Sequence, residues 1–232
     1  MPGPANFPPP DQRKLIAHAL PMLLFVVLLG FSGLWKEAEG PLWRTAPEFW
    51  IYPLQTLLCG AVLIYFRRAY QFHRLRHPIF TVVVALFVFV VWIAPQQWLG
   101  FAPRVLGFNL DTVANQPSLY WVTLAIRFLR LVLVVPCVEE IFWRGFLLRY
   151  LIAEKFAMVP FGTFSWLSFI VVTLAFCFSH ARADWPAALI AGALYNIVAY
   201  RTRSLASCLV AHSLTNLALG LWIVATRQWG FW

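Results

Sequence analysis

An acidic pair, Glu139-Glu140, interrupts the apolar run LVLVVPCV-EE-IFW, whereas the other seven acidic residues lie in the N-terminal tail or between apolar runs. A carboxylate at membrane depth costs on the order of 3 kcal/mol, so two in succession require a partner, a cavity or a function. On a helix, Glu140 and Arg144 share a face and can form an ion pair. Glu139 points about 100° away from Glu140, and we expect it to act as a general base. In an alternative interpretation, both glutamates pair with Arg127 or Arg130 and only fix helix packing.

Two histidines and one amide in later apolar runs could complete a hydrolytic site. His180 follows Phe176 by four residues in FCFSH, and His212 precedes Asn216 by four residues in HSLTN, so each pair shares a helix face. Alone, a histidine in a membrane helix more often makes a helix–helix hydrogen bond. Together with the glutamates, these residues supply a base, an orienting group and hydrogen-bond donors for an oxyanion, which suits hydrolysis by an activated water.

Two further kinds of chemistry stay open. No cofactor is required by these residues, but a divalent metal such as zinc could be held by Glu139, His180 and His212. The chain has no HExxH motif, which argues against a zinc protease of that type. A cysteine nucleophile would depend on Cys177 and His180, and is the weaker hypothesis.

The elements that carry these residues are expected to be membrane helices. The 232 residues are 61% hydrophobic and 12% charged, with a mean hydropathy of +0.73, whereas soluble domains carry about a quarter charged residues. A transmembrane helix needs roughly 20 mostly apolar residues. Seven apolar runs approach that length: 17–35, 49–66, 79–98, 120–138, 159–178, 186–200 and 205–226. The sequence therefore predicts an all-α polytopic membrane protein with seven or eight transmembrane helices around a bundle-like or conical active-site cavity.

The eighth candidate helix is residues 139–152. Proline removes a backbone hydrogen bond and often kinks a helix, so after Pro136 this segment either continues the fourth run or begins a helix of its own. We expect residues 1–14 to form a Pro-rich tail and residues 15–232 to form a single transmembrane domain.

The net charge of +9 comes mostly from Lys and Arg residues in short connections between apolar runs. This is the positive-inside pattern of a membrane protein, so we expect the lipid bilayer rather than a nucleic acid as the partner. Arg13, Lys14 and the arginines of residues 67–76 predict a cytoplasmic N-terminus and a cytoplasmic second connection. The membrane face of the site stays open, because Arg127 and Arg130 lie inside the fourth run.

Three motifs in these runs resemble those of a known family. They are, in chain order, Glu139-Glu140-x3-Arg144, Phe176-x3-His180 and His212-x3-Asn216. Their types and order resemble the CPBP (Abi) family of intramembrane proteases, whose best-known members are the type II CAAX prenyl endopeptidases. The resemblance covers about residues 121–225 and implies an all-helical membrane fold. Within the family, the chain is similar to the CAAX protease-related proteins associated with exosortase systems.

The resemblance also implies roles for individual residues. Glu139 and His180 would activate a water, while His212 and Asn216 would stabilise the tetrahedral oxyanion. Arg144 would be the arginine of the first motif, in agreement with the ion pair expected from helix geometry. A prenylated substrate does not follow from the resemblance.

The sequence therefore predicts an intramembrane endopeptidase of a bacterial inner membrane that cleaves a membrane-embedded or lipid-anchored polypeptide. Two alternatives stay open. One is a non-catalytic membrane scaffold or immunity-type binding protein, which would not need His180 or His212. The other is a proton-coupled transporter in which Glu139 and the histidines relay protons, although the chain shows no inverted-repeat hydropathy.

Overall fold

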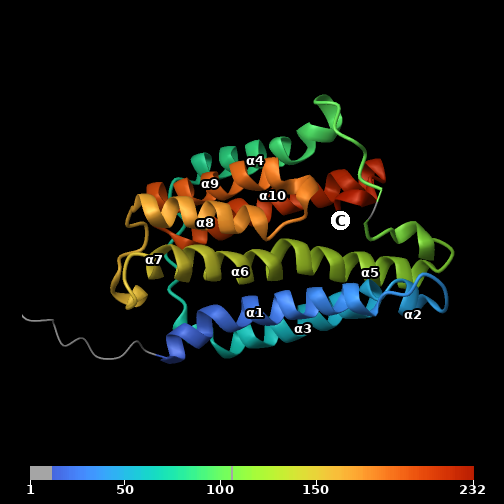
Figure 1. Cartoon of the computed structure of the whole chain (residues 1–232), viewed down its shortest axis with the longest axis horizontal. Helices are drawn as coiled ribbons and strands as arrows, with labels where there is room; N and C mark the ends of the chain where they lie inside the picture. Colours follow the sequence, from blue (N-terminus) through green and yellow to red (C-terminus); the bar gives the residue numbers. More distant parts are fainter. Residues whose placement is uncertain (1–11, 106) are drawn as a thin grey trace, which may run out of the picture.

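The computed structural model describes residues 12–105 and 107–232, which are helical with no strand among them (Figure 1). Five helices are long and apolar enough to cross a membrane: α1 (Gln12–Trp35), α3 (Glu48–Tyr65), α4 (Pro78–Trp98), the continuous helix Pro117–Tyr150 and α10 (Leu205–Thr226). The predicted all-α polytopic membrane fold is confirmed. Of the expected tail, residues 1–11 lie outside the described residues, and α1 already begins at Gln12.

The remaining α-helices are α2 (Leu42–Thr45), α8 (Trp166–Phe178) and α9 (Trp185–Thr202), of which α9 is as long as α3. The prediction that the fifth apolar run is helical from residue 159 is wrong at its start. Pro160 has no backbone N–H to donate, and Gly162 adopts a positive φ of 80°, a conformation that does not belong to a right-handed helix. As a result, α8 is only 13 residues long.

The helix Pro117–Tyr150 forms the centre of the molecule (Figure 1). It consists of α5 (Pro117–Leu129), the π-helical segment η3 (Arg130–Val134), α6 (Val135–Glu140), the π-helical segment η4 (Ile141–Leu147) and α7 (Leu148–Tyr150). Residues 139–152 are therefore not a separate eighth helix. The wider π turn directly before Pro136 gives room to the proline ring and lets the carbonyls that lose a donor find new partners.

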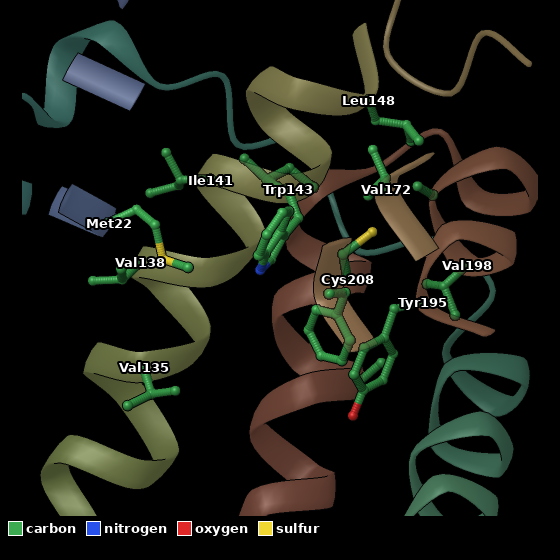
Figure 2. Packing of buried hydrophobic residues seen from close by; sticks show 14 of the residues in the cluster. Met22, Val135, Val138, Ile141, Trp143, Leu148, Val172, Tyr195, Val198 and Cys208 are labelled. Carbon is green, nitrogen blue, oxygen red and sulfur yellow. The ribbon is translucent and has the colours of Figure 1, made fainter. Parts of the chain in front are cut away.

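The central helix lies between two groups of helices. On one side, α1 packs along α3; on the other, α4 packs along α10 and α8 packs along α9 (Figure 1). Figure 2 shows Val138 and Ile141 of the central helix near Met22 of α1, with Tyr195 of α9 and Cys208 of α10 across from them. The acidic pair thus lies at the level of the main hydrophobic core.

Gly192 of α9 packs closely against α8. A Cβ atom there would lie 3.1 Å from Cδ1 of Phe176 and 3.3 Å from the carbonyl oxygen of Thr173. We expect Gly192→Ala to lower the free energy of unfolding by about 1–3 kcal/mol through overpacking, measured by denaturant unfolding in detergent. Gly60→Ala is the matched control in α3, because a Cβ there meets no atom within 4 Å. Equal stability of the two variants would contradict this account of the α8–α9 contact.

Candidate active site

The guanidinium of Arg144 is fully buried and bound on three sides. Its Nη1 donates to Oε1 of Glu140 at 3.0 Å, its Nε donates to Oδ1 of Asn196 at 3.0 Å, and its Nη2 donates to the carbonyl of Gly192 at 3.1 Å. Glu140 is also fully buried. The predicted Glu140–Arg144 ion pair is confirmed, and α9 supplies the hydrogen bonds that a buried pair needs beyond its own attraction.

His212 is held by the same carboxylate. Its Nδ1 lies 2.9 Å from Oε1 of Glu140. Because the carboxylate paired with Arg144 accepts hydrogen bonds, Nδ1 carries the proton, and Nε2 is left for other contacts. Tyr195 stacks on the imidazole with ring centroids 5.1 Å apart and donates from its hydroxyl to Thr215 at 2.8 Å. The orientation of His212 is therefore fixed from two sides.

Glu139 has no comparable partners. It is 8% exposed, and its Oε2 has no hydrogen-bond partner among the described residues. No ion pair joins it to an arginine in the described part of the chain, and Arg130 instead donates from Nε to Oε1 of Gln55 at 2.7 Å. The alternative in which both glutamates pair with Arg127 or Arg130 is therefore wrong.

His180 lies just beyond the C-terminal end of α8. Its Nδ1 is 2.7 Å from the carbonyl oxygen of Phe176, which can only accept, so Nδ1 carries the proton and Nε2 is the acceptor. Phe176 and Trp92 flank the imidazole with centroid distances of 4.7 and 5.5 Å. The neighbouring Cys177 binds through Sγ to the carbonyl of Trp185 at 3.3 Å rather than to His180.

One cavity of about 330 Å³ gathers most of the predicted site. Glu139, His180, His212, Asn216 and Phe176 all line it. The amide of Asn216 donates one hydrogen bond, at 2.9 Å, to the carbonyl of Leu131; its second N–H remains available. Glu140 and Arg144 do not line the cavity. Glu140 binds His212, which does line it.

The candidate metal ligands share this cavity. Within residues 12–105 and 107–232, no three His, Cys, Asp or Glu side chains are grouped so as to hold a metal ion. A divalent metal held by Glu139, His180 and His212 therefore stays a prediction. Nδ1 of each histidine binds a protein oxygen, which leaves Nε2 as the nitrogen that could ligate a metal.

Several cavity residues were not predicted as part of the site. Arg104, Arg127, Asp184, Phe231 and Trp232 also line it. Arg127 could have been predicted from the sequence, because it is a charged residue in an apolar run and precedes Glu139 by a multiple of four residues. No comparable signal existed for Arg104, which reaches the cavity from the connection after α4 and pairs with Asp184.

Residues 121–218 match the family model of the type II CAAX prenyl endopeptidase Rce1-like proteins. The matched range contains all three motifs, from Glu139 to Asn216. Over these residues the chain is similar to the Rce1-like family. No curated protein and no solved structure matches the chain significantly. The Rce1-like match confirms the resemblance to CPBP proteins and supports a membrane enzyme of the protease type, whereas the exosortase-associated branch stays a prediction.

Removing both partners of the buried pair should cost less stability than the sum of the two single removals. Glu140→Gln leaves the guanidinium of Arg144 buried without its counter-charge, and we expect a loss of about 3 kcal/mol in the free energy of unfolding. The double variant Glu140→Gln/Arg144→Gln should lose less than the sum of the two single variants, because they share one interaction. Thermal unfolding in detergent measures all three. Strictly additive losses would contradict the coupling.

Proposed function

We propose that this chain is an intramembrane endopeptidase in which Glu139 activates the attacking water. The difference between the two adjacent glutamates carries the proposal. Glu140 is occupied by Arg144 and His212, whereas Oε2 of Glu139 is unpartnered among the described residues and Glu139 shares a cavity with His180. Of the pair, only Glu139 is free to take a proton from a water in the cavity.

In the proposed reaction, a water donates one hydrogen bond to the carboxylate of Glu139 and the other to Nε2 of His180. Glu139 removes the first proton, and the water oxygen forms a bond to the carbonyl carbon of the substrate peptide. The π electrons of the carbonyl move onto its oxygen, which becomes the oxyanion of a tetrahedral intermediate.

Asn216 and His212 are the proposed donors to that oxyanion. Asn216 has a second amide N–H beyond the one bound to Leu131. His212 donates to Glu140 through Nδ1, so it can donate from Nε2 only when the imidazole is doubly protonated. Collapse of the intermediate breaks the C–N bond, and the proton held by Glu139 passes to the leaving amine.

The proposed substrate is a membrane-embedded or lipid-anchored polypeptide. The cavity lies between helices that are apolar enough to cross a membrane, and apolar side chains such as Trp92, Leu131 and Leu219 form part of its wall. Binding from the bilayer would concentrate and orient such a substrate. Nothing in this arrangement requires a prenyl group.

Glu139→Gln tests the proposed base. The substitution keeps the size of the side chain and removes its basicity, so we expect turnover to fall by about 100-fold or more while folding and membrane insertion persist. Photo-crosslinking in membranes, followed by mass spectrometry, should capture uncleaved substrate on the variant. Glu37→Gln, in the exposed connection after α1, is the matched control and should behave as wild type. Undiminished formation of cleavage fragments by Glu139→Gln would overturn the proposal.

We also propose that the cavity faces the outer side of a bacterial inner membrane. At the end of the bundle where α1 begins and α7 and α9 end (Figure 1), ten basic residues gather: Arg13, Lys14, Arg67, Arg68, Arg74, Arg76, Arg149, Lys155, Arg201 and Arg203. Basic connections favour the cytoplasmic side. The cavity extends to the opposite end, where Arg104, Asp184 and Trp232 line it.

Cysteine labelling tests this orientation. In sealed spheroplasts, a membrane-impermeant maleimide should label Gln116→Cys, at the cavity end of α5, but not Arg68→Cys, after α3. Both positions are exposed, so detergent should make them react equally. The chain without an added cysteine gives the background from its four native thiols. Labelling of Arg68→Cys alone in sealed spheroplasts would reverse the proposed orientation.

A further inference from the structure

Arg127 is a buried cation with unused hydrogen-bonding capacity. It is 5% exposed and lines the cavity, and its Nε and Nη1 have no acceptor among the described residues. Its guanidinium carbon lies 4.6 Å from the ring centre of Tyr52, 5.5 Å from that of Phe108 and 5.4 Å from that of Trp232. Tyr52 also accepts a side-chain hydrogen bond from Arg127, so Nε and Nη1 are the groups of the guanidinium that are left without an acceptor.

A second arginine enters the same cavity from a different element. Arg104 pairs through Nη1 with Asp184 and lies over the ring of Phe231 at 4.1 Å. Its side chain is 8% exposed, and its Nε and Nη2 also have no acceptor in the described part of the chain. Two guanidinium groups therefore face one cavity, each with N–H groups left over.

The acidic residues nearby do not saturate these groups. Asp184 is committed to Arg104. Glu48 attracts Arg127 electrostatically, but its Oε1 accepts from Lys36 at 2.9 Å. Glu139 lies farther along the same helix. Since buried charges without partners are costly, this end of the cavity favours an anion.

The position of Arg127 relative to Glu139 limits which anion can be bound. Arg127, Leu131, Val135 and Glu139 all line the cavity at four-residue steps along the central helix. At 1.5 Å per residue, the two charged residues are separated by roughly 18 Å of helix axis. An extended peptide covers that length in roughly five residues.

We infer that Arg127, assisted by Arg104, binds a carboxylate of the peptide substrate within roughly five residues of the scissile bond. This inference rests on the proposed peptidase function and adds a substrate class to it. The carboxylate is either the C-terminal one or that of an Asp or Glu side chain. A planar guanidinium matches a carboxylate through paired N–H···O bonds, and a peptide without one leaves the arginines unpaired, so the cavity discriminates against it.

Peptide binding to the full-length Glu139→Gln protein tests the inference without requiring turnover. The first probe is an N-acetylated hexapeptide of Leu and Ala with a free C-terminal carboxylate, compared with its C-terminal carboxamide. The second comparison uses the carboxamide peptide with one central Asp or one central Asn. Isothermal titration calorimetry in detergent gives each dissociation constant. We expect at least one carboxylate probe to bind about tenfold more tightly than its neutral counterpart. The two comparisons show whether the protein binds the C-terminal carboxylate or that of the Asp side chain.

Substitutions then assign the effect to Arg127. In the same background, Arg127→Met should reduce the carboxylate advantage to about twofold or less, whereas Arg127→Lys should keep part of it. Arg130→Met is the matched control, because Arg130 is equally buried but does not line the cavity. An unchanged advantage in Arg127→Met would overturn the inference.

The first comparison needs no substitution at Arg127, so the inference stays testable if Arg127→Met fails to fold. Equal affinities for all charged and neutral probes would also overturn it. Failure of the proposed base appears separately, as continued cleavage by Glu139→Gln in membranes.

Discussion

A carboxylate and a guanidinium that are both removed from water must neutralise each other and satisfy their remaining polar atoms within the protein. The Glu140–Arg144 pair does so by recruiting other helices: Arg144 binds Gly192 and Asn196 of α9, and Glu140 binds His212 of α10. Asn196 in turn donates to Thr173 of α8 at 3.1 Å. The positions of three helices relative to the central helix thus depend on one ion pair, and the ring of His212 is placed as part of the same network.

Two adjacent glutamates can serve different purposes because successive residues on a helix point about 100° apart. Glu140 faces the helices that bury it, whereas Glu139 faces the cavity. A single carboxylate could not do both, because a group held by an arginine and a histidine has little capacity left to take a proton. Glu140 therefore supports the site while Glu139 is left for the proposed chemistry, although the two residues are adjacent on one helix.

The helical fold and the Glu140–Arg144 pair were predictable, because apolar length and four-residue spacing are local properties of the sequence. The grouping of Glu139, His180, His212 and Asn216 was expected from their combined chemistry and from the resemblance of the three motifs to a known family, not from local spacing. Other features depend on contacts between distant segments and were not predictable. The bond between His212 and Glu140 is one, and the cavity positions of Arg104 and Trp232 are others. The continuity of the helix through Pro136 was undecidable, since a proline can end a helix or be accommodated by a wider turn.

That wider turn, η3, also sets the rotational phase of the central helix. In a regular α-helix, each four-residue step overshoots one full turn by about 40°, so three steps from Arg127 would rotate the side chain at 139 by roughly 120°. The additional residues per turn in η3 offset this drift and leave both charged residues on one wall of the cavity. The number of residues in η3 is therefore more constrained than their identity. Exchange of one apolar residue for another within η3 would keep Arg127 and Glu139 on the same wall of the cavity. Insertion or deletion of one residue would instead rotate Arg127 and Glu139 away from each other.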